Sequence, residues 1–483
     1  MAALLAAFAL AVSVGPARGQ VRGRALLETI TVVTGTGDSV QAELGRLSVP
    51  EDYRQPAGTR ITLAFLRFRG MGAGAPLLYL AGGPGASGTA AIHSRRASAL
   101  LARRAQGDLI LFDQRGTGMS DPTLNCPEPF SYPLDQRVDA DVMTAAYRRF
   151  ARSCAASWRD RGVDLARYNT EASADDIQSL AVAIGVSQLQ LLGSSYGTHL
   201  ALAVMRRHPT LVNRAVLIGP EGPDHTLKLP RQVDAHLQDL SRLFAADSAS
   251  ARELPDFRGQ LGTLVARLRT SPVRATVYDS VRHDTVGVVV SAFDALAIAA
   301  GLIGRSATIA QIPRIFGPAM RGDLSPLAEL VPEMSRRAEI SAMSAAMDCA
   351  SSSSPQRRQE VSRQAETTVL GTMVDFPNPQ WCEAWGVSPL SEAFRTPVRA
   401  TMPVLIIAGT LDGLTPVQNA RDVLRGLTHG ALITVVGGAH DNLADDSRVS
   451  RLITEFLMGG RARDTTISLP QIRFAPGGAG GHQ

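Results

Sequence analysis

Lysine is almost absent from this sequence of 483 residues: Lys228 is the only one, so the formal net charge of +5 comes from arginine. We attribute this skew to genome composition rather than to a ligand. The arginines form no long basic run and are not interleaved with aromatic residues, which argues against nucleic-acid binding. None of the four cysteines has the Cys-x-x-Cys or Cys-x-x-His spacing of a zinc site. We expect neither a metal nor another cofactor.

Apolar runs long enough to cross a bilayer are also missing at the start of the chain. The run Ala2–Val14 is too short for that purpose, and the small residues Gly15–Gly19 follow it. This pattern resembles the hydrophobic region and exit of a signal peptide. We predict a signal peptide over residues 1–19 rather than a buried helix, because the following stretch is polar and rich in glycine. The protein is then secreted or periplasmic in a bacterium, with no stable membrane anchor after signal removal.

The four cysteines fit export. They allow three pairings, of which we favour the two local ones, Cys126 with Cys154 and Cys349 with Cys382. Disulfides persist in oxidising compartments, so this pairing agrees with a secreted or periplasmic protein.

Strand patterns change along the chain. Short β-rich runs with turn signals come first and predict antiparallel strands, namely Thr29–Val33, Ala42–Val49 and Arg60–Arg67. Nearly continuous apolar runs follow and predict strands that are buried on both faces, namely Leu77–Leu80, Leu109–Phe112, Leu189–Leu192, Ala215–Ile218, Val404–Ile407 and Leu432–Val436.

Helical patterns separate these strands. The clearest runs from Ser173, as the N-cap, to Ile184, with Gly185 at its end. Alternating strands and helices indicate an α/β fold with a mostly parallel, doubly wound sheet. The long, largely helical interval 221–400 interrupts this alternation, and we interpret it as an inserted cap domain. The predicted segments are a core in two parts, 20–220 and 401–470, the cap 221–400, and a flexible tail 471–483.

The sequence Gly193-Ser194-Ser195-Tyr196-Gly197 directly follows one predicted strand and precedes an apolar helix. A serine hydroxyl is a poor nucleophile, so it must stand on a sharp turn beside a general base. Small flanking residues permit such a turn. We therefore predict that Ser195 is a catalytic nucleophile.

A glycine-rich loop, residues 82–88, follows the strand Leu77–Leu80. Its bare backbone can approach a substrate carbonyl and supply an N–H group to an oxyanion hole. We select the N–H groups of Gly83 and Tyr196, because Pro84 has none. A phosphate-binding loop is excluded, since no Gly-Lys-Ser or Gly-Lys-Thr follows.

Asp412 and His440 each come just after a predicted strand. The other histidines fall in or near helices or in the insertion, so His440 alone stands where a general base is needed. We predict the triad Ser195, Asp412 and His440, whose order along the chain is the one found in α/β-hydrolases.

Together with Gly82-Gly83-Pro84-Gly85 and the segment 113–120 (Asp-Gln-Arg-Gly-Thr-Gly-Met-Ser), these residues resemble the α/β-hydrolase family of prolyl iminopeptidases and tripeptidyl aminopeptidases. Ala81 stands where iminopeptidases often have histidine. With the paired cysteines, this makes the chain more similar to the exported tripeptidyl-aminopeptidase-like group. The resemblance implies a serine aminopeptidase that releases N-terminal residues or short peptides through an acyl-enzyme.

An aminopeptidase binds a peptide with a free N-terminus, which requires a carboxylate where the cap meets the core. Glu221, just after the strand Ala215–Ile218, is the first candidate, with Glu383 and then Asp348 behind it. We expect Arg115 to form a structural ion pair and Trp381 and Trp385 to pack around a disulfide.

Two other functions stay open. An esterase or lactonase would use the same triad, because the sequence does not encode the leaving group. A non-catalytic binding protein on a hydrolase scaffold is the second alternative, although all three triad residues are present. The oligomeric state is not encoded in any pattern we recognise.

Overall fold

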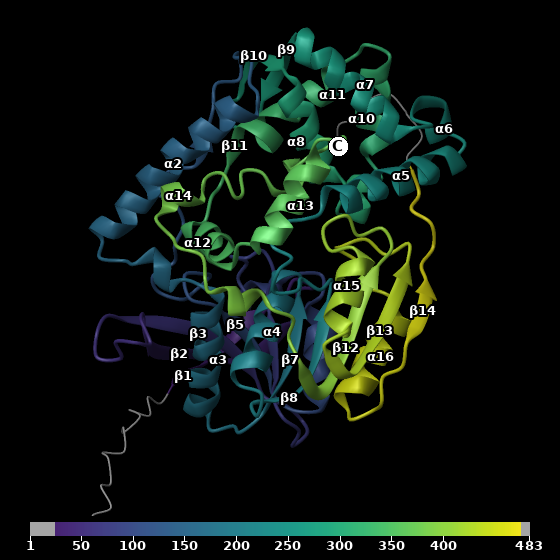
Figure 1. The fold of residues 1–483 in the computed structure, drawn as a ribbon. Coiled ribbons are helices and arrows are strands. Elements are labelled where there is room, and N and C mark those ends of the chain that lie inside the picture. The colour runs from purple at the N-terminus through teal and green to yellow at the C-terminus, as the bar shows by residue number, and fades with distance from the viewer. Residues whose placement is uncertain (1–24, 475–483) are drawn as a thin grey trace, which may run out of the picture.

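A ten-stranded sheet forms the lower part of the molecule, and the upper part is mostly helical (Figure 1). The computed structural model describes residues 25–474, so the predicted signal peptide lies outside the described residues. In spatial order the strands are β1 (Leu26–Val33), β2 (Ser39–Pro50), β3 (Arg60–Phe68), β5 (Leu109–Asp113), β4 (Leu77–Leu80), β7 (Leu189–Ser194), β8 (Val212–Ile218), β12 (Ala400–Gly409), β13 (Leu427–Val436) and β14 (Thr465–Ser468).

The sheet has an antiparallel and a parallel part. Strands β1, β2, β3 and β5 pair antiparallel in that order, and every pairing from β5 onward to β14 is parallel. The opening runs with turn signals therefore form the antiparallel edge, and the continuous apolar runs form the parallel strands, as the sequence predicts. This arrangement confirms the predicted α/β-hydrolase fold.

Helices cover both faces of the sheet, which explains why the parallel strands are apolar throughout. In β4, Leu78 and Leu80 face one core cluster, whereas Leu77 and Tyr79 face another. The first cluster includes residues of α3 (Thr170–Ile184), α4 (Tyr196–Arg207) and α15 (Val417–Leu424), and the second includes residues of α1 (Ala97–Ala102) and α16 (Ser447–Leu457).

Helix α3 begins earlier than the sequence predicts. Asn169 is its N-cap and accepts a hydrogen bond from the Ala172 N–H at 3.0 Å, while Ser173 lies buried inside the helix. Asn is as good an N-cap as Ser, so N-cap preference alone could not distinguish the two residues. The predicted end is confirmed, because Gly185 has a φ of 76°.

The upper layer is built largely from the predicted insertion. Its elements are α5 (Pro230–Ala246), α6 (Ser250–Glu253), α7 (Phe257–Thr270), the hairpin β9 (Val273–Asp279) and β10 (Asp284–Val290), α8 (Ala292–Leu302), α9 (Ser306–Ile309), α10 (Ile312–Met320), α11 (Ser325–Ala328), α12 (Ala342–Ser351), α13 (Pro355–Ala365) and α14 (Cys382–Trp385).

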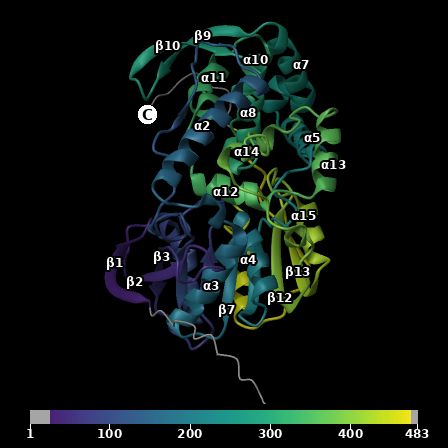
Figure 2. The same cartoon turned by 60° about the vertical axis from the view of Figure 1, so that its left-hand side comes forward.

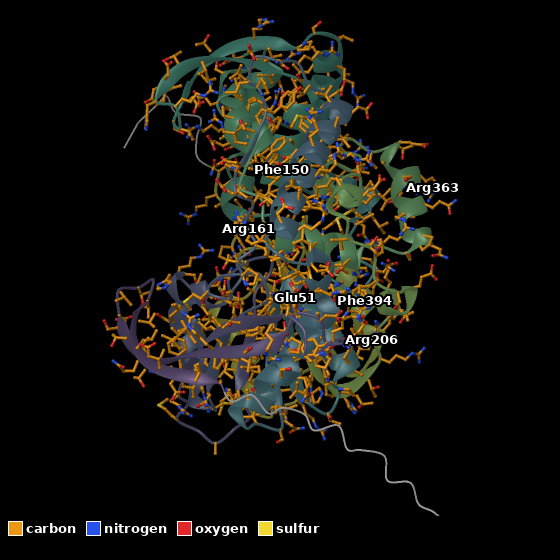
Figure 3. The ribbon with its side chains drawn as sticks, turned by 90° about the vertical axis from the view of Figure 1, so that its left-hand side faces the viewer. Glu51, Phe150, Arg161, Arg206, Arg363 and Phe394 are labelled. Carbon is orange, nitrogen blue, oxygen red and sulfur yellow. A yellow bond between two sulfur atoms is a disulfide. The ribbon has the colours of Figure 1, made fainter. Side chains whose placement is uncertain are left out.

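An earlier segment joins this layer. Helix α2 (Ala140–Asp160) contacts α12 and α14, and β6 (Phe130–Ser131) pairs with β11 (Arg337–Ala338) (Figure 2). In Figure 3, Phe150 of α2 lies in the upper layer, whereas Glu51, just after β2, lies near the junction of the two layers. Residues 130–160 thus precede the predicted cap but pack with it.

Both predicted disulfides are present, Cys126 with Cys154 and Cys349 with Cys382. The first ties α2 to the loop after β5, and the second ties α12 to α14. At the C-terminal end, the Phe474 ring packs edge-on against Phe244 of α5, so the beginning of the predicted flexible tail contacts the upper layer. Within residues 25–474 we find no helix long and apolar enough to span a membrane.

Candidate active site

Ser195 stands on a strained turn between β7 and α4. Its φ of 54° and ψ of −127° are unusual for a residue with a side chain. The flanking glycines permit the turn, since a Cβ at Gly193 would lie 2.5 Å from the Gly197 carbonyl oxygen, and one at Gly197 would lie 2.0 Å from that of Leu80. This geometry matches the nucleophile elbow of the predicted motif.

His440 and Asp412 meet beyond the carboxyl ends of β13 and β12. The Nδ1 atom of His440 lies 2.8 Å from Oδ2 of Asp412, and the side chain of Asp412 is fully buried. A buried carboxylate on Nδ1 fixes the imidazole with Nε2 as its free, basic nitrogen. The two predicted residues are therefore brought together in the orientation that a general base requires.

Thr415 completes this pair, and the sequence analysis missed it. Its hydroxyl donates to Asp412 Oδ2 at 2.7 Å and lies 3.1 Å from His440 Nδ1. The N–H groups of Leu414 and Thr415 donate to Asp412 Oδ1 at 2.9 and 2.8 Å. Burial alone would raise the pKa of Asp412. The charge and hydrogen bond of His440, together with the hydrogen bonds from Thr415, instead lower this pKa below the ordinary value.

Ser195 and His440 are not hydrogen-bonded to each other: among residues 25–474, no donor reaches the Ser195 Oγ within bonding distance. Catalytic hydrogen bonds are often long without substrate and tighten in the complex. Gly219 leaves room for the imidazole, since a Cβ there would lie 3.2 Å from His440 Cε1.

The glycine-rich loop lies directly against the nucleophile. A Cβ on Gly82 would be 2.9 Å from the Cβ of Ser195, so the bare backbone allows the close approach that an oxyanion hole needs. Asp113 braces the loop, because its carboxylate accepts hydrogen bonds from the Ser87 hydroxyl and from the N–H and hydroxyl of Thr89, at 2.6–3.0 Å. Asp113, the first residue of the segment 113–120, thus holds the glycine-rich loop in place.

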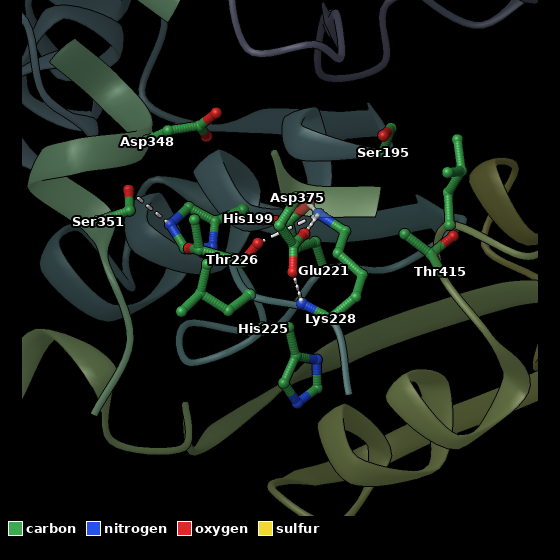
Figure 4. Close-up of polar contacts among 12 residues, drawn as sticks. Ser195, His199, Glu221, His225, Thr226, Lys228, Asp348, Ser351, Asp375 and Thr415 are labelled. Atoms are coloured by element: carbon green, nitrogen blue, oxygen red, sulfur yellow. Dashed lines mark hydrogen bonds and ion pairs between the residues drawn. The ribbon is translucent and has the colours of Figure 1, made fainter. Parts of the chain in front are cut away.

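A carboxylate cluster, formed by Glu221, Asp348, Asp375 and Lys228, lies where the two layers meet (Figure 4). The Lys228 ammonium is 4.0 Å from Glu221 Oε2 and 3.8 Å from Asp375 Oδ1. It also donates to the Thr226 carbonyl at 3.2 Å. The only lysine of the chain thus lies among three acids, and its positive charge stabilises their negative charges.

The cluster holds more negative than positive charge. Burial, together with the charge of Glu221, raises the pKa of Asp348 to about 7. Burial also raises the pKa of Asp375 to about 6, although Lys228 opposes this. Within the described residues, no N–H or O–H donates to the Glu221 carboxylate. The three acids therefore have one lysine, Lys228, as their only ion-pair partner within the described residues.

One hydroxyl links the cluster to the nucleophile. Thr198 Oγ1 accepts a hydrogen bond from the Glu221 N–H and donates one to the Ser195 carbonyl, both at 2.7 Å. Glu221 is therefore held in a fixed relation to Ser195.

Our second candidate, Glu383, lies outside the carboxylate cluster. Its side chain is 88% exposed and pairs with Arg148 at 3.1 Å, so it is a solvated surface acid and not a member of the cluster. Asp348, our third candidate, and the overlooked Asp375 lie in the cluster. Arg115 is structural as predicted, because it forms a buried bidentate pair with Asp176 at 2.7–2.8 Å.

The two tryptophans also pack as expected. Trp381 and Trp385 are buried and meet edge to face with ring centroids 5.3 Å apart, beside the bridge that joins Cys349 to Cys382. Among the residues that the structure describes, no group of three or more His, Cys, Asp or Glu is arranged to hold a metal ion.

A cavity of about 400 Å³ with a mixed polar and apolar lining adjoins the loop that carries Asp412. Leu414 lines it, as does Gly304, whose carbonyl accepts a hydrogen bond from the His440 N–H at 2.9 Å. Its other walls include Tyr147, Phe293, Met334, Met373, Val374 and Phe376. Because Asp375 lies between Val374 and Phe376, one short segment borders both this cavity and the carboxylate cluster.

The chain is similar to several known proteins. The model of a family described as alpha/beta hydrolase fold matches residues 75–447. A tripeptidyl aminopeptidase of Streptomyces coelicolor is 27% identical over 463 residues, which cover 88% of this chain and 82% of the relative. Serine protease Hip1 of Mycobacterium tuberculosis is 24% identical, covering 86% and 85%. A solved proline iminopeptidase-related protein from Thermus thermophilus has 16% identity and a TM-score of 0.36, covering 90% of this chain and 99% of that one.

Proposed function

The chain belongs to the alpha/beta hydrolase fold family and is a serine peptidase within it, and we propose that it is an exported aminopeptidase that releases N-terminal residues or short peptides. The carboxylate cluster carries this proposal. Three buried acids share one lysine there, and Thr198 ties the cluster to Ser195. The α-ammonium group of a peptide is a cation that fits the excess negative charge.

In the proposed reaction, Ser195 Oγ attacks the carbonyl carbon of the scissile amide while His440 Nε2 takes its proton. Asp412 stabilises the imidazolium that forms. The N–H groups of Gly83 and Tyr196 receive the oxyanion; Tyr196 is the first residue of α4, so its N–H has no intrahelical acceptor. His440 then protonates the leaving amine, and water releases the acyl group from Ser195.

The cavity beside Leu414 supports a peptide substrate with a nonpolar side chain near the scissile bond, because aromatic, methionine and aliphatic residues line part of it. Five of its lining residues are aromatic or methionine, Arg305 also lines it, and no carboxylate is among the lining residues. A substrate could bind its ammonium group at the carboxylate cluster and an apolar side chain in this cavity. The segment 373–376 borders both sites, which supports a single extended binding site.

Export is a further part of the proposal. Two disulfides join cysteines 28 and 33 residues apart, and such bridges suit a secreted or periplasmic protein better than a cytosolic one. Fractionation of producing cells, with the mature N-terminus read by Edman sequencing, tests both the compartment and the predicted cleavage near residue 19. Recovery of an uncleaved protein in the cytosol would contradict it.

The activity is tested with aminoacyl and tripeptidyl chromogenic amides, each free and N-acetylated, using the wild type and Ser195→Ala. We expect the free amides to be cleaved much faster than the acetylated ones, and the cleavage of both to be lost in the variant. If acetylated amides or simple esters are cleaved as well as free amides, the requirement for an amino terminus is wrong, and the esterase alternative gains support.

A further inference from the structure

A second cavity, which we call the arginine pocket, lies between α13, α15 and the loop that follows β8. It has a volume of about 580 Å³, and Arg357, Arg395, Arg399 and Arg425 line it. Ser195, Asp412 and His440 are not among its lining residues. The reaction proposed above gives this pocket no role.

Two of these arginines, one buried and one half-buried, have no ion-pair partner among residues 25–474. Arg395 is 7% exposed and donates only to the carbonyl oxygens of Ser351, Leu390 and Ser391. Arg357, which is half-buried, donates through its Nε to the Leu227 carbonyl at 2.7 Å. Within residues 25–474 neither guanidinium has a carboxylate within 4.0 Å, and the Nη2 atom of each has no hydrogen-bond acceptor.

Among the other buried arginines, two form ion pairs, whereas Arg103 has no carboxylate within 4.0 Å in the described part of the chain. Arg115 pairs with Asp176, and Arg336 pairs with Asp294, through short contacts between fully buried side chains. This is the usual arrangement, because a buried charge without a partner is costly. Burial lowers the pKa of both Arg357 and Arg395, which reflects that cost. Two guanidinium groups on one cavity wall, each with an Nη2 atom that has no acceptor among the described residues, therefore favour an anionic ligand.

Two acids also line the pocket, and both are already engaged. Asp224 accepts hydrogen bonds from the N–H and hydroxyl of Ser354. Asp422 accepts from Gln418 and pairs with Arg425 at 2.6 Å, and it lies 3.8 Å from His225. Burial and the nearby cations lower the pKa of His225 to about 3, so this side chain is neutral. Four arginines against two aspartates leave the wall positive.

We propose that the arginine pocket binds a small molecule through an oxyanion group, a phosphate or a pair of carboxylates. A guanidinium presents two parallel N–H donors that match both groups. The volume exceeds that of a bare phosphate, so the ligand carries the anionic group on a larger body. This site is separate from the proposed aminopeptidase site and does not depend on it.

The pocket also touches the loop next to Glu221. Gly222 lines it, its N–H donates to His225 Nδ1 at 3.0 Å, and its carbonyl lies 3.1 Å from His199 Nδ1. A ligand held by Arg357 thus contacts the backbone that positions the carboxylate cluster.

Calorimetric titration of the whole protein with sodium phosphate and, separately, with sodium citrate tests the site, with sodium chloride at matched ionic strength as the blank. We expect saturable binding of at least one anion with a Kd of about 1 mM or tighter. Saturation by phosphate alone assigns a phosphate group, and saturation by citrate alone assigns carboxylates.

Arg357→Gln should weaken that binding about tenfold or more, because a charge-assisted hydrogen bond contributes that much. Arg363→Gln is the matched control: it removes the same charge from the same helix, but Arg363 pairs with Glu360 and points away from the molecule (Figure 3). If Arg357→Gln does not fold, as judged by circular dichroism, Arg399→Gln at the exposed rim replaces it. Absence of saturable binding, or equal weakening by Arg363→Gln, would overturn the proposal.

Discussion

Glu221→Gln separates an aminopeptidase from an esterase or an endopeptidase on this fold. The substitution keeps the shape of the side chain and removes one negative charge from the carboxylate cluster, 4.0 Å from the Lys228 ammonium. Truncating one partner of a buried charge pair costs about 2–5 kcal/mol. We expect a value at the lower end, because Asp348 and Asp375 remain, and because the charge of Glu221 raises the pKa of Asp348, which would ionise more readily in the variant.

A loss of about 2–3 kcal/mol corresponds to a decrease of roughly 30- to 150-fold in kcat/KM. The ammonium group is bound in both the ground and transition states, so the decrease should lie mainly in KM. The assay is steady-state hydrolysis of one tripeptidyl amide in its free and N-acetylated forms. Only the free form should lose activity in Glu221→Gln.

Glu383→Gln provides the control, because it makes the same chemical change at a side chain that is 88% exposed. It should alter kcat/KM less than about twofold, as expected for a solvated surface pair. Equal losses for free and acetylated substrates in Glu221→Gln would refute the assignment, as would a comparable loss in Glu383→Gln.

Three further predictions follow from the same contacts. Thr415→Val removes the hydroxyl that donates to Asp412 and should lower kcat about tenfold at unchanged KM, measured by steady-state kinetics. The pKa of Asp348 is raised to about 7, so kcat/KM for free amines should rise with pH through 7, and the melting temperature should fall as pH rises from about 4 to 7. Asp348→Asn should flatten both profiles. With an ester substrate, the wild type and Asp348→Asn should show the same pH dependence of activity. Replacing Cys349 and Cys382 by serine should lower the free energy of unfolding by about 3–4 kcal/mol in urea titrations.

Local sequence patterns were sufficient for much of the fold. Continuous apolar runs such as Leu77–Leu80 mark strands covered on both faces, because burial on two sides leaves no polar alternation. The same pattern identified the residues at the strand ends. It therefore predicted that Asp412 and His440 lie close together, and they are in contact in the structure. The N-cap of α3 was misjudged because Asn169 and Ser173 are equally suitable in isolation.

The carboxylate cluster was only partly predictable. Glu221 comes just after a strand, so the sequence predicted that it lies at the carboxyl edge of the sheet. Asp375, however, lies 147 residues beyond Lys228 in a loop without a motif. Nothing in composition distinguished Glu383 from Asp348, since both stand in the insertion. Their difference in burial comes from tertiary packing, which no local pattern encodes.

Active-site labelling tests the central claim, that Ser195 is the nucleophile, most directly. A fluorophosphonate probe is added to the folded protein, and the adduct is located by mass spectrometry of the digested chain. We predict one adduct per molecule on Ser195, its loss in Ser195→Ala, its retention in Ser194→Ala and much slower formation in His440→Gln. Failure to label, or an adduct on another serine that persists in Ser195→Ala, would contradict the assignment.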